Sequence, residues 1–514
     1  MWPALQFQRR ESTYRRRRPE AGALHQIVRE NLLTLYAAVE QGFASALPGF
    51  VKGELEGFIA CGVLQRGFAV LSCPSCQKRK LVAFSCGGRG FCPSCTGRRM
   101  AEGAANLVSY VLPRDVALRQ FVLTLPFELR ARVAYDKQLL GGIGRIFVDS
   151  VLGWYTRKMR ARGVEGGRSG AVTVLQRTQA DLRLNPHYHS VVLDGVFAAG
   201  DDGVLGFHPL RSVSNSELGD LLTLLRIRVL GWLSRRGVIE DEAELGVVDE
   251  DFAAREPALA ALARASVSGF APAGPERRAR PPLALGGVPG VELSAPLSVS
   301  ELGFSLHAAT TVRAGDAAGR EALCKYVLRP AIAQERVQLL DDGLVRLVLR
   351  KPFKDGTAAI DLDPLSVLCR LAASVPPPRM HTVRFAGVLS AAHKWRPLVV
   401  PPAPDEELAD DRPAHEHTQR PATHRCHYWP WARLLQRSLA VDGEKCDACG
   451  ARMKLRALVF AVHSIERMLR HLGEPTELLP LSPARDPPFF KSRAVRRKLG
   501  ELDAPQGQIE MFGA

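Results

Sequence analysis

The chain has 514 residues, 46% of them apolar, which excludes a wholly disordered protein and predicts about two to four domains. Its 69 Lys and Arg outnumber 53 Asp and Glu, giving a net charge of +16 that favours a polyanionic partner; a merely basic globular protein is the alternative. No segment offers the ~18 uninterrupted apolar residues of a membrane span. The N-terminus has no secretory pattern, so we expect a cytoplasmic, nucleoid-associated protein without membrane contact.

The N-terminal part combines a basic arm with a cysteine-rich unit. Residues 1–24 form the arginine-rich arm, and helical periodicity over 24–43 opens a helical and zinc-binding domain predicted at 25–112. The stretch 73–95 within this domain has few apolar residues of its own. We therefore expect something other than a hydrophobic core to hold it together.

Cysteine spacing predicts that a structural Zn²⁺ ion holds this unit. The sequence Cys-Pro-Ser-Cys occurs at 73–76 and again at 92–95, and in a reducing compartment such pairs indicate zinc rather than disulfides. Four thiolates so arranged can close a tetrahedral site. The predicted ligands are Cys73, Cys76, Cys92 and Cys95. Cys86 is either a replacement ligand or free, and unrelated turns with free thiols would leave the repeated motif unexplained.

Basic residues surround these cysteines. They are predicted to contact DNA phosphates, with a solvated charged face as the equally weighted alternative. The predicted DNA-binding residues are Arg79, Lys80, Arg89, Arg98 and Arg99.

The pattern changes after residue 113, where an α+β domain is predicted over 113–400. A buried strand at 120–127 is followed by a long helix at 134–163, a strand at 171–178 and another strand at 182–197. Strand, helix, strand, strand is typical of an antiparallel-sheet core with flanking helices.

The second half of this domain begins with a stretch of low periodicity. Residues 253–297 are rich in Ala, Pro, Arg and Gly and are predicted to be a linker or peripheral insertion. A strand at 304–314, a helix from Asp316 to Arg329 and a hairpin at 345–362 follow, the hairpin turning at Asp355 and Gly356.

The C-terminal part is predicted to be a linker and a mostly helical region. Residues 401–423 are rich in Pro and charge, and 424–514 form the C-terminal region. A lone CxxC at Cys446 and Cys449 needs two more ligands for a second zinc site. The nearest candidates are His424, Cys426 and His427.

Two histidines, His187 and His189, flank one aromatic residue in a predicted strand. Side chains at i and i+2 share a face and can ligate one metal, although such a pair is common by chance and two structural histidines are the alternative. In one antiparallel register the preceding strand places Gln176 opposite His187 as a third ligand, with Asp181 and His307 as alternatives. Neutral ligands with open positions suit Mg²⁺ or Mn²⁺ acting on a phosphate.

Tyr326 is the candidate nucleophile for such a site. It lies in the last turn of a helix with Asp316 as the N-cap and Pro330 as the terminator. A phenol with a pKa of ~10 needs cations or a metal to favour its phenolate, and Arg329 and Lys325 are close in sequence. A surface tyrosine that anchors the helix is the alternative.

These segments together resemble the transposases of the insertion-sequence 91 group. The resemblance covers most of residues 25 to 400 and rests on "CPSCQKRKLVAFSCGGRGFCPSCTGRRM", "LNPHYHSVVLDGVF", "LCKYVLRPAIAQERV" and "DGTAAIDLDPLSVLCRLAASVPPPRMHTVRFAGVLSAAHKWRP". The group contains rolling-circle transposases of the His-hydrophobic-His endonuclease superfamily with an N-terminal zinc-binding domain. The resemblance therefore implies that this chain is a DNA transposase that acts on single-stranded DNA at the element ends and on target DNA.

The resemblance also implies roles for particular residues. His187 and His189 hold a divalent metal against the scissile phosphate, and Tyr326 attacks it to leave a 5′-phosphotyrosine and a free 3′-hydroxyl. Two-tyrosine members carry a second tyrosine a turn away, but Ala322 and Pro330 occupy those positions, so the chain resembles a single-tyrosine branch. Sequential use of one tyrosine, a homodimer or attack by the 3′-hydroxyl can each complete strand transfer. A replication initiator or relaxase, and a non-catalytic zinc-dependent DNA-binding protein, are the alternative functions.

Overall fold

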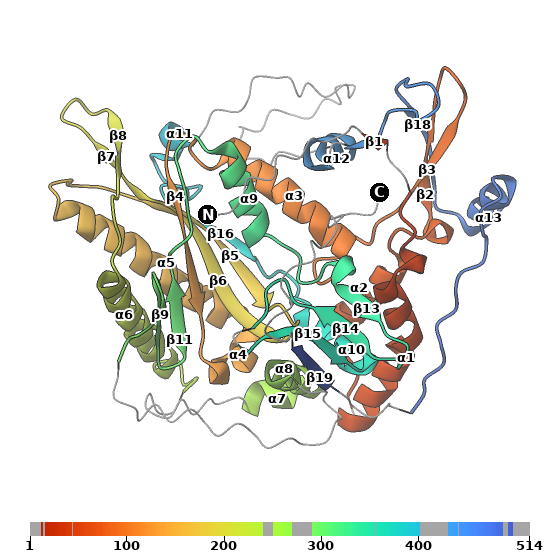
Figure 1. Cartoon of the computed structure of the whole chain (residues 1–514), viewed down its shortest axis with the longest axis horizontal. Coiled ribbons are helices and arrows are strands. Elements are labelled where there is room, and N and C mark those ends of the chain that lie inside the picture. Colours follow the sequence, from red (N-terminus) through yellow and green to blue (C-terminus); the bar gives the residue numbers. More distant parts are fainter. Residues whose placement is uncertain are drawn as a thin grey trace.

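The computed structural model describes residues 12–13, 16–43, 45–239, 250–269, 290–353, 355–400, 430–439, 441–486 and 492–496. The predicted linker at 401–423 lies outside these ranges, as do His424, Cys426 and His427. Within them, helices and antiparallel sheets form an α+β fold, which confirms the predicted class (Figure 1). None of the described helices is long and apolar enough to cross a membrane.

An eight-stranded antiparallel sheet forms the centre of the molecule. Its order is β16-β5-β6-β4-β11-β10-β9, with β12 also paired to β4. The strands are β4 (Leu118–Thr124), β5 (Gly170–Thr178), β6 (Leu184–Leu193), β9 (Glu292–Ala295), β10 (Ser298–Glu301), β11 (Phe304–His307), β12 (Thr311–Val312) and β16 (Val383–Gly387). Strands β5 and β6 form a hairpin in which Gln176 lies opposite His187, so the predicted register is confirmed.

Helices cover both faces of this sheet (Figure 1). They are α3 (Pro93–Tyr110), α4 (Phe127–Ala134), α5 (Lys137–Arg160), α6 (Asn215–Ser234) and α9 (Ala317–Val327). One face packs on α5 and α6 through side chains such as Phe121 and Tyr188, and the other packs on α3 and α9 through Val174 and Val191. Because side chains alternate along β6, His187 and His189 share the face of Val191 and lie toward α9.

Capping and turn residues determine where helix α9 begins and where the hairpin after it turns. The side chain of Asp316 caps α9 by accepting a hydrogen bond from the Gly319 N–H at 2.8 Å. The hairpin forms from β14 (Val345–Val348) and β15 (Thr357–Leu362), and Gly356 at its turn has a φ of 80° that favours glycine. Strands β13 (Val337–Leu339) and β19 (Ser492–Arg496) complete this second sheet.

Part of the linker or insertion predicted at 253–297 is helical instead. Helix α7 (Glu250–Arg255) is followed by α8 (Pro257–Ser268), and α8 buries Leu259 and Leu262 in a core shared with α1 (Ala23–Phe43) and α10 (Pro364–Ser374). Five of the twelve residues of α8 are alanine, a residue that favours helix but gives little contrast between a buried and an exposed face. Periodicity therefore failed to reveal this helix.

A third sheet joins the two ends of the chain. Strand β18 (Lys454–Val459) pairs with β2 (Phe68–Ser72), which pairs with β3 (Arg79–Ala83), and the sheet stands with α13 (Val462–His471) at the right of Figure 1. The described C-terminal region is thus not mostly helical as expected, since β18 and β19 complete sheets built elsewhere. The remaining elements are β1 (Ser12–Thr13), η1 (Pro19–Ala21), α2 (Gly49–Ala60), η2 (Leu64–Arg66), β7 (Gly195–Ala199), β8 (Leu205–Pro209), η3 (Gln334–Arg336), α11 (Arg396–Val399), α12 (Trp431–Leu439) and β17 (Val441–Asp442).

Candidate active site and cysteine clusters

His187 and His189 lie side by side on β6 and are buried, with ring centroids 4.9 Å apart. The Nδ1 atom of His187 is 2.6 Å from the backbone carbonyl of Asn185, to which it can donate, so Nε2 is left as a ligand atom. The Nε2 of Gln120 lies 2.7 Å from Nδ1 of His189, to which it can donate, and the buried Nε2 of His189 has no hydrogen-bond partner among the described residues. A metal on this Nε2 requires the imidazole proton on Nδ1, from which the amide oxygen of Gln120 would then accept. An unpartnered buried nitrogen is costly, and a metal ion would satisfy it.

Burial keeps both imidazoles neutral at pH 7. Desolvation lowers the pKa of His187 to about 4 and that of His189 to about 2, and the positive charge of Arg329 acts in the same direction. A neutral imidazole has the free electron pair that metal coordination requires. The pair is therefore suited to binding a cation rather than to carrying a proton.

Gln176 connects the histidines to the end of helix α9. Its Nε2 donates to the backbone carbonyls of Tyr326, at 3.3 Å, and Val327, at 2.7 Å. These hydrogen bonds use the amide nitrogen, whereas a glutamine binds a metal through its amide oxygen. Gln176 can thus hold the tyrosine-bearing helix end and still offer a ligand atom beside His187.

The alternative third ligands are placed less favourably. The carboxylate of Asp181 lies in the turn between β5 and β6, where it accepts hydrogen bonds from the backbone N–H and the Nε of Arg183. His307 shares the face of His189, but β4 separates its strand from β6. Of the three candidates, only Gln176 is directly paired with a histidine of the site.

Tyr326 lies against His189 from the end of α9. Their ring centroids are 5.7 Å apart at an interplanar angle of 83°, and the tyrosine is 44% exposed, so its phenol is open to a substrate. The guanidinium carbon of Arg329 lies 4.3 Å from the centre of the Tyr326 ring. Helix α9 ends at Val327, two residues earlier than expected, because Pro330 disfavours helical backbone at the residue that precedes it.

Two further arginines, Arg336 and Arg350, interact electrostatically with Arg329. Burial, followed by the charges of Arg350 and Arg329, lowers the pKa of Arg336 to about 10. Burial and the charge of Arg329 also lower the pKa of Arg350, whose charge in turn interacts with Tyr326. Positive groups this close repel one another until an anion joins them. Neither Arg336 nor Arg350 was among the predicted site residues. Arg336 lies in the segment "LCKYVLRPAIAQERV" and Arg350 in the predicted hairpin, but neither residue was assigned a role.

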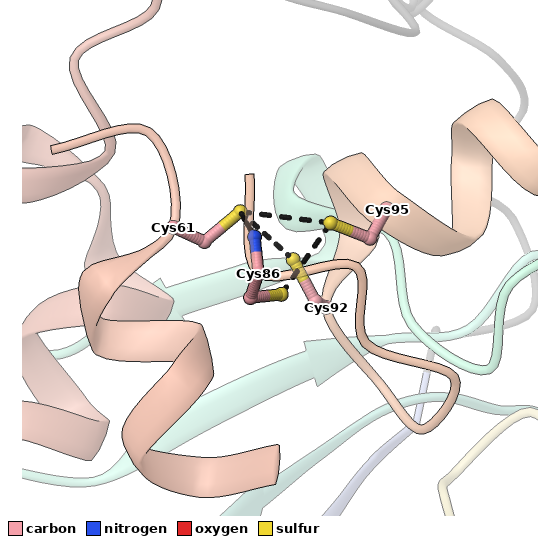
Figure 2. A group of neighbouring side chains, drawn as sticks. All are labelled: Cys61, Cys86, Cys92 and Cys95. Carbon is pink, nitrogen blue, oxygen red and sulfur yellow. Dashed lines mark hydrogen bonds between the residues drawn. The ribbon is translucent and has the colours of Figure 1, made fainter. Parts of the chain in front are cut away.

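Four cysteine sulfurs converge at the N-terminal end of α3 (Figure 2). They belong to Cys61, Cys86, Cys92 and Cys95 and lie within 4.8 Å of one another, with 3.7 Å between Cys61 and Cys95 and 3.4 Å between Cys86 and Cys95. Tetrahedral zinc with Zn–S bonds of about 2.3 Å separates its sulfurs by about 3.8 Å. The four thiols therefore fit a structural zinc ion.

The predicted zinc quartet of Cys73, Cys76, Cys92 and Cys95 is wrong as a single site. Cys73 and Cys76 instead lie with Cys446 and Cys449 in a second group, while Cys92 and Cys95 are ligand candidates in the first.

The hairpin of β2 and β3 explains this division of the cysteines. The turn at 73–76 closes the hairpin, whereas Cys61 precedes it and Cys86 follows it at its open end. Strands of five residues place the two ends about 17 Å apart, too far for one ion. Cys61 was missed because it belongs to no CxxC pair.

The predicted DNA-binding residues divide between the two cysteine groups. Arg79 and Lys80 lie on β3 and the others flank the first group: Arg89, Arg98 and Arg99. The side chains of Arg89 and Arg99 donate to the backbone carbonyls of Met380, at 2.6 Å, and Gly87, at 2.8 Å. These two therefore also hold loops in place, and contact with DNA stays a prediction.

Two family models match the chain. One, described as a transposase zinc-binding domain, matches residues 34–125 and includes the first cysteine group. The other, described as a putative transposase, matches residues 170–396 and includes His187, His189 and Tyr326. No curated protein and no solved structure matches the chain significantly.

A transposase zinc-binding domain followed along the chain by an α+β domain that matches a transposase model is the organisation of a transposase. The chain belongs to the insertion-sequence 91 family of transposases.

Proposed function

We propose that this transposase cleaves and joins single-stranded DNA at the ends of a rolling-circle element through a 5′-phosphotyrosine intermediate. The observation that carries the proposal is the contact of the exposed Tyr326 with His189, whose buried Nε2 lacks a partner among the described residues. A surface tyrosine that only anchors α9 would have no reason to pack against the ring of His189.

His187, His189 and Gln176 are the residues that would hold a divalent metal. Their available donors are imidazole nitrogens and an amide oxygen, which are uncharged and would leave the cation its full attraction for phosphate. Bound Mg²⁺ or Mn²⁺ would act as a Lewis acid on the scissile phosphate.

Tyr326 would supply the nucleophile. Its Oη forms a bond to phosphorus, the bond from phosphorus to the 3′-oxygen breaks, and the phenolic proton passes through solvent to the departing oxygen. One DNA end is then held as a 5′-phosphotyrosine ester and the other carries a 3′-hydroxyl. Because the ester replaces one phosphodiester by another, attack by a 3′-hydroxyl reverses the step and joins strands.

Two arginines would stabilise the charge that builds up on the phosphate. Arg329 stacks on the tyrosine ring and Arg350 lies within electrostatic range of it. Helix α9 carries no second tyrosine, and Ala322 occupies the position one turn earlier. We therefore expect strand transfer to use Tyr326 again, the tyrosine of a second subunit, or a released 3′-hydroxyl.

A nicking assay tests the proposal. The full-length protein is mixed with single-stranded oligonucleotides from the element ends in Mg²⁺ or Mn²⁺, and the adduct is mapped to a peptide by mass spectrometry. We expect a covalent adduct at Tyr326, none with Tyr326→Phe, and an unchanged adduct with the control Tyr36→Phe, whose hydroxyl bonds Glu56 on the distant α1–α2 pair. An adduct that survives Tyr326→Phe would show that another residue is the nucleophile.

Replacement of both histidines separates catalysis from DNA binding. We expect His187→Ala with His189→Ala to bind the oligonucleotides and form no adduct. If nicking persists in this variant, the histidines are structural and the proposed site is wrong.

A further inference from the structure

We propose that Cys73, Cys76, Cys446 and Cys449 bind a second Zn²⁺ ion, and that this ion fastens the segment 441–471 to the N-terminal domain. The four sulfurs lie within 4.8 Å of one another, with 3.4 Å between Cys73 and Cys449 and 3.6 Å between Cys76 and Cys446. Cys446 and Cys449 lie outside both segments that match family models. Cys73 and Cys76 lie inside the segment that matches the zinc-binding domain, so the site would combine ligands from within that domain and from beyond it.

The two CxxC turns have the same backbone hydrogen bonds. The N–H of the residue after the second cysteine donates to the carbonyl of the first cysteine, at 3.0 Å in one turn and 2.9 Å in the other. The N–H of the first cysteine donates to the carbonyl five residues later, at 2.9 Å in both. Two matching turns that face each other present four thiols to one point, as a tetrahedral ion requires.

The backbone conformation of the two turns also indicates a bound metal ion. The residue after the second cysteine has a positive φ in both turns, 75° at Gly450 and 59° at Gln77. A glycine adopts this conformation freely, but a glutamine there costs about 1 kcal/mol or more unless its surroundings enforce it. A metal bound to the cysteines of its turn would enforce it.

The sulfurs are not joined as disulfides. Their separations of 3.4 and 3.6 Å exceed the S–S bond of about 2.05 Å, and all four cysteines are free. Zinc bound by four thiolates carries a net negative charge, which nearby cations would offset. Lys78, just after the turn at 73–76, is such a cation, and its ion pair with Asp447 at 2.8 Å connects the two turns.

The segment that the ion would fasten has little core of its own. Among the described residues, the small apolar cluster at the cysteines buries Leu71 and Met453, and a second small cluster joins α13 to β2 through Ile465 and Phe68. Clusters of this size bury too little area to offset the ordering of three strands and a helix. Metal binding would supply the missing stability.

The zinc content of the full-length protein tests this proposal and does not depend on nicking activity. Elemental analysis should find about two zinc ions per wild-type chain. Cys446→Ser with Cys449→Ser should retain about one, as should Cys73→Ser with Cys76→Ser, and all four substitutions together should also retain about one because they remove the same ion. As a matched control, Cys324→Ala with Cys369→Ala, buried cysteines outside both groups, should retain about two.

A second measurement needs no variant. Alkylation of the zinc-loaded wild-type protein, followed by mass spectrometry, should leave Cys446 and Cys449 unmodified until a chelator is added, and should then modify them together with Cys73 and Cys76. Alkylation of Cys446 and Cys449 before chelation would overturn the proposal, as would retention of two ions by the Cys446→Ser, Cys449→Ser variant. A disulfide-linked pair among the four in freshly purified protein would overturn it as well.

Discussion

Gln120 is expected to position His189, and its replacement tests the architecture of the metal site. Its side chain is buried and lies 2.7 Å from Nδ1 of His189, the nitrogen opposite the proposed ligand atom. Gln120→Leu keeps the volume but removes the hydrogen bond, leaving a buried Nδ1 without a partner at a cost of about 1–3 kcal/mol. This corresponds to a loss of about 5- to 150-fold in metal affinity, comparable to the effect of other residues that orient metal ligands.

The assay is the Mn²⁺ dependence of nicking, together with direct Mn²⁺ binding. We expect Gln120→Leu to need more Mn²⁺ for half-maximal rate. Gln120→Glu should restore the affinity, because a carboxylate accepts from the Nδ1–H of a metal-bound His189, as the amide oxygen of Gln120 would after the amide turns over. The control is Thr173→Val, which removes a buried 2.6 Å hydrogen bond to Ser190 on the opposite face of the same sheet. An unchanged Mn²⁺ requirement in Gln120→Leu, or an equal change in Thr173→Val, would refute the argument.

The structure and the charge of the chain predict three further outcomes. The buried carboxylate of Asp194 accepts hydrogen bonds from Arg119 at 3.0 and 2.9 Å and from the Tyr155 hydroxyl at 2.7 Å. Asp194→Ala should therefore lower the free energy of unfolding, measured by urea titration, by about 3–5 kcal/mol. A loss below about 1 kcal/mol would contradict this prediction. Arg329→Lys keeps the charge but loses the planar stacking on Tyr326, and should slow single-turnover nicking by about 2- to 30-fold, whereas a wild-type rate would show that stacking is irrelevant. Affinity for single-stranded DNA should fall steeply with salt concentration, measured by fluorescence anisotropy, and a flat salt dependence would exclude phosphate contacts as its source.

Local patterns were enough to predict the strand that carries the histidines and the helix that carries the tyrosine. The alternation of β6 brings His187 and His189 to one face, and a short turn after β5 fixes the register that sets Gln176 beside them. The cap at Asp316 likewise located the helix that carries Tyr326. Each of these features depends on residues that are close in sequence.

The features that sequence reasoning missed depend on distant parts of the chain. Gln120 contacts His189 from the neighbouring strand β4, and Cys61 lies beside Cys95 although the whole β2–β3 hairpin separates them in the sequence. The CxxC pair at Cys446 was assigned to nearby candidates, although its partners in space are at the other end of the protein. Spacing within a motif gives no information about such contacts, because chain separation does not limit which elements pack together.

The joining of the two chain ends also sets an order of events during synthesis. The first cysteine group is complete once Cys95 has left the ribosome, but Cys73 and Cys449 are 376 residues apart. At about 5–20 residues per second, the turn at 73–76 waits roughly 20–75 s for its partner. A chain interrupted before Cys449 would therefore contain the whole eight-stranded sheet and still expose an unpaired edge on β2, which closes only after β18 has been translated.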